Sequence, residues 1–166
     1  MQARNGKGPV IKLAVMLLGD GWIEKDRIGY ASKDDTLLEY FNQLTKNLVG
    51  KSAKIRLSDR AFKAVVYSTS LVKSLKKLSP TFRTKRFEDG TFPPAKIPDE
   101  TFELPKDKIT EILQLIFSME GGVSVYARKS KKDYFTVERK VFLSCAHPNL
   151  TKQYVKLILS VIPELK

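Results

Sequence analysis

Two acidic residues in this chain each follow an apolar run and precede a glycine. Asp20 and Gly21 follow the run at 13–18, and Glu120 and Gly121 follow the run at 113–119. The C-terminal end of a helix already carries partial negative charge, so a carboxylate there is unfavourable unless a cation offsets it. Because the arrangement occurs twice, the sequence predicts two such helices side by side that together present paired acids to a metal ion.

The segments that must position these acids predict the same order of elements twice. The apolar run at 10–18 predicts a helix buried on most sides, and the apolar periodicity after Asp34 or Asp35, either of which could cap it, predicts a helix that ends at Gly50. Strands are predicted at 22–24, 27–32, 53–57 and 62–69, with a third helix at 70–78. The order begins again with a helix at 107–119, strands at 123–128 and 135–145, and a helix at 148–161. We therefore expect an α+β fold, a pseudo-twofold duplication of an αββαββα unit with a truncated second copy.

The sequence divides the chain into a tail, two halves and a linker between the halves. Residues 1–9 predict a flexible basic tail, in which Gly6-Lys7-Gly8 lacks the glycine spacing of a phosphate-binding loop. The first half covers 10–80, and the incomplete second half covers 107–166. Between them, weak periodicity and four prolines predict a linker at 81–106 that wraps around the halves rather than forming a further element. These prolines are Pro93, Pro94, Pro98 and Pro105.

The composition favours a polyanionic partner. The 166 residues carry a formal net charge of +12 at pH 7, and nucleic acid is the simplest partner for so basic a chain. The single cysteine, Cys145, excludes an internal disulfide and a thiolate zinc site. The single histidine, His147, excludes a histidine metal cluster and argues against a Ser-His-Asp triad. Because His147 precedes Pro148 at an expected strand-to-helix junction, we expect it to turn or cap the chain.

No stretch of the sequence is long enough to cross a bilayer. The apolar run at 10–18 follows basic residues as in a secretory signal, but Lys12 interrupts it and Asp20 follows soon after. We therefore expect a cytoplasmic protein that has no membrane partner.

The first acid-containing segment, 13–21, resembles the nine-residue signature of the LAGLIDADG homing endonuclease family. It matches the signature at Leu13, Ala14, Asp20 and Gly21. Residues 117–123 resemble the second copy of that signature in single-chain, two-motif members. Residues 27–38, which include Ser32-Lys33-Asp34, are similar to the segment after the motif in archaeal intron-encoded members. The resemblance covers 10–78 and 107–162.

This resemblance implies a metal site between two motif helices at the centre of a monomeric pseudo-dimer. Asp20 and Glu120 would be catalytic and metal-binding, and the backbone carbonyls near Gly19 and Met119 would add negative charge. The implied cofactor is Mg²⁺ or another divalent cation such as Mn²⁺. Lys33 would also be catalytic, because it would act on phosphate charge near the scissile bond.

The resemblance also implies that antiparallel sheets form a saddle on double-stranded DNA with a long target site. A two-stranded ribbon fits the major groove, and alternate side chains of each strand would point toward the bases. Lysines on the helix at 70–78 are expected to face solvent instead. The residues nominated for DNA contact are Lys54, Arg56, Lys63 and Tyr67 in the first half and Arg128, Lys131, Arg139 and Lys140 in the second.

Three functions follow from these patterns. The first is a site-specific, metal-dependent DNA endonuclease of the homing type. The second is a catalytically inactive relative that binds DNA or RNA, such as a maturase or a regulator. Ala146, which falls where the second half would match Lys33, and the incomplete second sheet favour that alternative, whereas Asp20 and Glu120 argue against it. The third, an unrelated RNA-binding protein, does not explain the duplicated acid-glycine motif.

Overall fold

The computed structural model describes residues 7–58, 61–129 and 135–165. The first half contains seven elements in the predicted order. They are α1 (Lys7–Asp20), β1 (Gly21–Ile23), β2 (Arg27–Ser32), α2 (Asp35–Val49), β3 (Lys54–Ser58), β4 (Ala61–Tyr67) and α3 (Thr69–Lys76). The second half contains α4 (Lys106–Glu120), β5 (Gly121–Lys129), β6 (Phe135–Leu143) and α5 (Pro148–Val161). The α+β prediction and the repeated order are confirmed.

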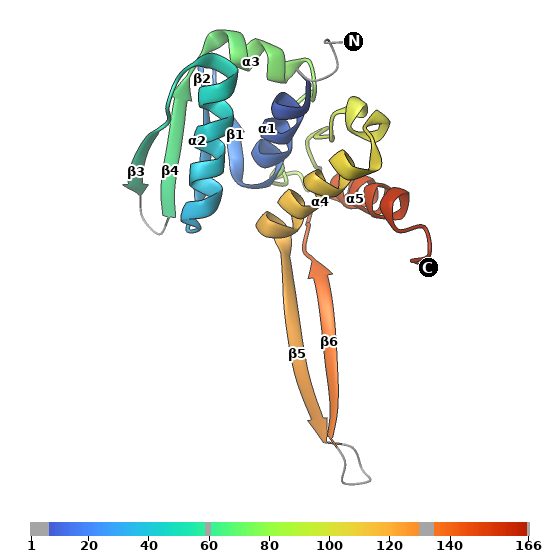
Figure 1. Cartoon of the computed structure of the whole chain (residues 1–166). Helices are drawn as coiled ribbons and strands as arrows, with labels where there is room; N and C mark the ends of the chain where they lie inside the picture. The colour runs from blue at the N-terminus through green and yellow to red at the C-terminus, as the bar shows by residue number, and fades with distance from the viewer. Residues whose placement is uncertain (1–6, 59–60, 130–134, 166) are drawn as a thin grey trace.

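The first half is built on a four-stranded antiparallel sheet in the order β1-β2-β4-β3. Its inner face carries Ile28, Tyr30, Ala64 and Val66, all buried, and α2 covers the sheet (Figure 1). The predicted boundaries of α2 correspond to its caps. The Asp34 side chain accepts the amide hydrogen of Thr36 at 2.8 Å, and Gly50 adopts a left-handed conformation with φ of 68°.

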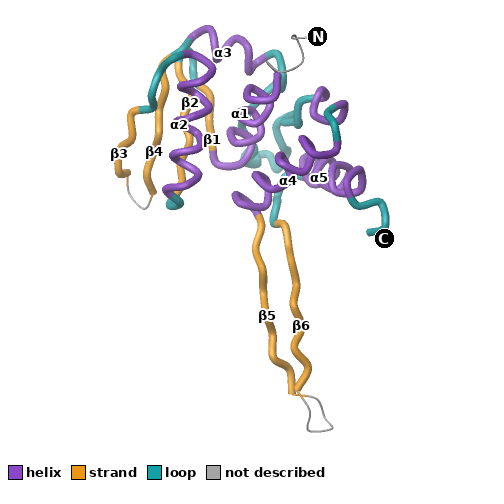
Figure 2. The backbone as a smooth tube through the Cα atoms, in the orientation of Figure 1, coloured by secondary structure: helices purple, strands orange, loops and turns teal. Residues whose placement is uncertain are grey.

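The second half is less complete. Its sheet has two strands, β5 and β6, and this hairpin projects away from the helices (Figures 1 and 2). Among the described residues, no strand pair follows α5 in the way that β3 and β4 follow α2. Side chains on both faces of the hairpin are exposed: Val123 and Val141 are 70% and 71% exposed on one face, and Tyr126 is 55% exposed on the other.

The helices α1 and α4 pack against each other between the halves (Figure 1). All residues of α1 from Leu13 to Leu18 are buried, as expected for a helix covered on most sides. Lys12 is the polar exception, and its Nζ lies 2.6 Å from Oε2 of Glu111 on α4. An ion pair thus joins the two central helices beside their apolar contact.

The linker crosses the second half and is fastened to α5. Nε2 of His147 lies 2.8 Å from the carbonyl oxygen of Pro93, and Nδ2 of Asn149 donates to the carbonyl oxygen of Ala95 at 2.9 Å. The His147 side chain also accepts the amide hydrogen of Leu150, so its expected role as a helix cap is confirmed. A short 3-10 helix at Asp99–Glu103, which weak periodicity did not predict, lies near the end of the linker.

The first helix begins earlier than predicted. α1 includes Lys7, Gly8 and Pro9, which the sequence assigned to the flexible tail at 1–9; residues 1–6 of that tail lie outside the described chain. Proline is compatible with the first turn of a helix, where its missing amide hydrogen is not needed. Within the described ranges, no helix has the length and apolar character needed to cross a membrane.

Candidate acid pair and nucleic-acid interface

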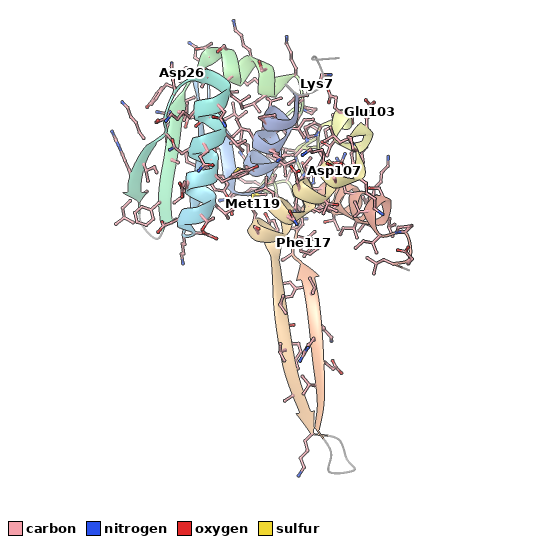
Figure 3. All side chains as sticks on the ribbon, viewed as in Figure 1. Lys7, Asp26, Glu103, Asp107, Phe117 and Met119 are labelled. Atoms are coloured by element: carbon pink, nitrogen blue, oxygen red, sulfur yellow. The ribbon has the colours of Figure 1, made fainter. Side chains whose placement is uncertain are left out.

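The two acids predicted from sequence are the last residues of the paired helices: Asp20 ends α1 and Glu120 ends α4. The helix ends approach closely at Gly19. A Cβ atom placed on Gly19 would lie 3.2 Å from Sδ of Met119 and 3.6 Å from Oε1 of Glu120. Figure 3 labels Met119 near the end of α4, before the hairpin begins. The packing therefore brings together the two ends that carry the acids.

The electrostatics of this pair are unfavourable for two carboxylates. Burial raises the pKa of Asp20, although its side chain remains accessible to solvent. The pKa of Glu120 is raised by burial and then by the negative charge of Asp20. Within the described chain, no cationic side chain forms an ion pair with either acid. Among the described residues, therefore, no protein cation offsets the negative charge of the pair.

The donor set at this position suits a hard divalent cation. The two carboxylates are joined by backbone carbonyl groups near Gly19 and Met119, in the last turns of α1 and α4. Carbonyl groups in the last turn of a helix lack an amide hydrogen-bond donor from the same helix. The described residues contain no cluster of three or more His, Cys, Asp or Glu side chains that could enclose a metal. Mg²⁺ is commonly bound by one or two carboxylates and keeps waters or takes phosphate oxygens for the remaining positions. The arrangement fits such an ion.

Lys33, the third residue predicted for this site, is not brought into contact with the acids. It is exposed between the end of β2 and the α2 cap, and it makes no hydrogen bond or ion pair within the described chain. Its ammonium group is therefore free to meet a ligand that approaches from solvent.

The first sheet has a basic outer face opposite its core face. Arg56 pairs with Lys63 and Lys54 pairs with Val65 across β3 and β4, so these side chains lie on one face with Tyr67. The structure thus places the four residues nominated for DNA contact in this half on one surface. Together with Arg27, they line a shallow hollow.

Arg27 belongs to this basic face, but the sequence analysis did not nominate it. It pairs with Tyr67 across β2 and β4, and its Nη1 donates to the Tyr67 hydroxyl at 3.0 Å. Its Nε donates to Oε2 of Glu24 at 2.6 Å, which partly neutralises the guanidinium. The sequence did contain a signal for this position, because Arg27, Gly29 and Ala31 alternate along the predicted strand and therefore share one face.

The nominated residues of the second half do not share one face. Lys140 pairs with Ser124 and lies over the Tyr126 ring, with Nζ 5.8 Å from the ring centre. Arg139 pairs with Val125 on the opposite, valine-rich face. The nomination of both residues for one DNA-facing surface is therefore corrected, because neighbouring strand residues point in opposite directions.

Of the other two residues nominated in this half, Arg128 lies in β5 and Lys131 lies outside the described residues. The strand register shows which face of the hairpin matches the basic face of the first sheet. In the first sheet, Gly29 pairs with Trp22, and Arg27 lies two residues before Gly29. In the hairpin, Phe142 pairs with Gly122, and Lys140 lies two residues before Phe142. The equivalent face is therefore the one that carries Lys140.

A buried tyrosine near the acids was also missed. Tyr30 is fully buried, pairs with Gly21, and stacks on Phe41 with ring centres 5.5 Å apart. Its hydroxyl has no hydrogen-bond partner in the described protein. The Ser32 hydroxyl acts to lower the pKa of Tyr30, and its oxygen accepts the amide hydrogen of Asp34. Burial, followed by the charge of Asp20, raises the pKa of Tyr30.

Comparisons with known proteins identify the fold. No protein-family model matches the sequence, and no curated protein matches it in sequence. The meganuclease I-SmaMI bound to uncleaveable DNA has a similar structure, with a TM-score of 0.51 and 15% identity, over 94% of this chain and 70% of that chain. I-SmaMI is a LAGLIDADG homing endonuclease, and the chain has the fold of that family.

Two structures of the homing endonuclease I-DmoI are also similar over most of their length. One, from a study of mesophilic variants, has a TM-score of 0.49 and 12% identity, over 96% of this chain and 97% of that chain. The other, a complex with DNA and Mn, has a TM-score of 0.48 and 11% identity, over 95% and 98%.

Proposed function

We propose that this protein is a site-specific, divalent-metal-dependent endonuclease of double-stranded DNA, of the homing type. The observation that carries the proposal is the convergence of Asp20 and Glu120 at the ends of two packed helices, in a molecule of net charge +12. The fold supports it, because I-SmaMI, whose structure resembles this chain, is a meganuclease bound to DNA.

In this proposal the acid pair would hold the metal ion. The Asp20 and Glu120 carboxylates, with the carbonyl oxygens of Gly19 and Met119, supply hard oxygen donors. A bound Mg²⁺ or Mn²⁺ would activate water and stabilise the leaving oxygen of a phosphodiester. Lys33, which is exposed and forms no ion pair within the described residues, would neutralise phosphate charge as the DNA backbone approaches.

Recognition is assigned to the two sheets. The basic face of the first sheet presents Arg56 and Lys63 as neighbours, and these long side chains reach base edges or phosphates in the major groove. The hairpin β5–β6 has the width of a groove-binding ribbon and presents Lys140 and Tyr126 on the equivalent face. The two sheets together account for a long target.

A selection experiment tests the proposal. Duplexes with randomised sequence are selected for binding to the protein in EDTA, and Mg²⁺ or Mn²⁺ is then added to the recovered pool. We expect wild type to cut the pool and Asp20→Asn and Glu120→Gln to bind the same duplexes without cutting. Glu88→Gln, which removes an exposed acid from the linker, is the matched control and retains cleavage. Specific binding without wild-type cleavage in any divalent metal would overturn the nuclease assignment.

Such an outcome would favour the alternative, an inactive protein of the same fold that binds DNA or RNA. Two observations support this candidate. Ala146 replaces a cation in the second half, and the second sheet has two described strands where the first has four. The same selection distinguishes the two functions, because the alternative predicts that wild type leaves the bound sequences intact in every divalent metal.

A further inference from the structure

Arg27, on the outer face of the first sheet, is held in place by side chains on both sides of it. Its Nε donates to Oε2 of Glu24 at 2.6 Å, and its Nη2 forms an ion pair with the same oxygen. Its Nη1 donates to the hydroxyl of Tyr67, on the neighbouring strand, at 3.0 Å. The Arg27 side chain is nevertheless 38% exposed. The guanidinium is therefore fixed in orientation and still open to solvent.

The carboxylate that holds Arg27 is itself held from β1. Nε1 of Trp22 donates to Oε1 of Glu24 at 3.2 Å. The Trp22 ring lies close against Gly29, its partner on β2, and a Cβ atom placed on Gly29 would overlap Cζ2 of that ring. Glycine at this position therefore lets the indole pack against the sheet and reach Glu24.

These partners leave two hydrogen-bond donors of Arg27 available. A guanidinium has five N–H groups. Glu24 takes the one on Nε and one on Nη2, and Tyr67 takes one on Nη1. Within the described part of the chain, one N–H is then left on each terminal nitrogen. Such a pair of donors matches O6 and N7 of guanine, which lie side by side in the major groove.

The charge around Arg27 favours a base edge over a phosphate. Glu24 offsets the positive charge of the guanidinium, and its carboxylate repels a phosphate that approaches the same place. O6 and N7 of guanine are neutral acceptors, so they do not meet this repulsion. In contrast, Lys54 and Arg56 on the same face form no ion pair among the described residues, and they keep the full charge that attracts a phosphate.

We propose that Arg27 reads one guanine of the DNA target, with Glu24 and Trp22 as positioning residues. This inference rests on the DNA recognition proposed above and names the base that this part of the first sheet accepts. Adenine presents a donor where guanine presents O6, so one of the two hydrogen bonds is lost. Because the pair is partly exposed, we expect a preference for guanine of about tenfold, in the lower part of the range for such contacts.

The experiment measures binding alone, with the full chain in EDTA. Duplexes with randomised sequence are selected with wild type and with Arg27→Lys, which keeps the charge but not the two-pronged donor. Guanine enrichment should disappear at one position with the variant and persist elsewhere. At that position, wild type should bind adenine about tenfold more weakly than guanine, and 7-deazaguanine, which lacks N7, should also bind more weakly. Hypoxanthine keeps O6 and N7 and should bind as guanine does, whereas Arg27→Lys should bind all four versions with similar affinity.

Glu24→Gln tests the positioning role. The substitution removes a negative charge that faces the DNA, so affinity for unrelated duplexes should not fall, yet the preference for guanine should decrease. Glu88→Gln makes the same change in charge at an exposed position of the linker and should keep the preference. Lys54→Ala, assigned to a phosphate, should weaken binding to all four versions alike.

The outcomes separate this inference from the function on which it rests. Equal wild-type affinity for guanine and 7-deazaguanine would overturn the inference and leave the nuclease function intact. An equal loss of affinity for all four versions in Arg27→Lys would also overturn it, because Arg27 would then contact the DNA backbone. A wild type that prefers guanine but never cuts would support the inference and overturn the nuclease function. Recovery of no duplex would overturn both. Folding of each variant is verified by circular dichroism.

Discussion

Removal of one acid from the central pair should stabilise the fold in the absence of metal. Asp20→Asn eliminates a negative charge that raises the pKa of Glu120 and removes a carboxylate whose own pKa is raised by burial. Unit charges 4 Å apart repel by about 1 kcal/mol in water and by about 4 kcal/mol near a protein surface. Because Asp20 remains accessible to solvent, the lower figure applies, and we expect a gain of about 1 kcal/mol.

The pH dependence gives this prediction its sign. A carboxyl group whose pKa is higher in the folded state binds more protons when folded, so its charged form costs stability as the pH rises above its ordinary range. The ordinary values are 3.8 for Asp and 4.5 for Glu. The advantage of Asp20→Asn should therefore be present at pH 7 and disappear below about pH 4.

Urea unfolding in EDTA at pH 7 and pH 4 measures this effect. A gain of about 1 kcal/mol corresponds to an increase of about 2–4 °C in the melting temperature of a domain this size. Addition of Mg²⁺ should reverse the order, because a ligand that binds only the folded state stabilises wild type and not the variant. Glu88→Gln makes the same change in net charge at an exposed position and should show neither effect. A variant less stable than wild type at pH 7 in EDTA would refute the reasoning.

Three other substitutions test the packing around the site. Gly21→Ala should cost about 1–3 kcal/mol in urea unfolding, because a Cβ there would lie 2.5 Å from Cα of Leu17. Tyr30→Phe should stabilise the protein by about 1 kcal/mol by the same measure, since it removes a buried hydroxyl without a partner; a loss of stability would show that the hydroxyl is satisfied. Hydrogen bonds from Lys108 and then Lys12 lower the pKa of Glu111 to about 2, so Glu111→Gln should lower the free energy of unfolding at pH 7. Wild type should lose this contribution to stability as the pH falls from about 4.5 toward 2, and the variant should not.

The elements that depend on local signals could be predicted from the sequence. The apolar spacing of α2 and its caps at Asp34 and Gly50 are short-range features, and the structure confirms both ends. The acid-glycine motif is local in the same sense, because it marks where each central helix must end. The short 3-10 helix at Asp99–Glu103 has no comparable signal, since few residues contribute to its periodicity.

The orientation of the second hairpin could not be predicted in the same way. Alternation shows that Arg139 and Lys140 point to opposite faces, but it does not show which face corresponds to the basic surface of the first sheet. That correspondence required the pairing of Gly122 with Phe142, which is a contact between distant segments. In a ribbon with both faces exposed, burial does not distinguish the faces either.

The central helix pair shows most clearly why local patterns are incomplete. Within its own segment, Lys12 is an interruption of an apolar run, and its only sequence-level use was to argue against a secretory signal. In the structure it pairs with Glu111 on the other central helix, at a point where two otherwise apolar surfaces meet. A lysine there without Glu111 would lose its partner at a half-buried position, which is costly. The pairing of the helices, and so the meeting of Asp20 with Glu120, is therefore encoded in part by a charge whose partner lies in the other half of the chain.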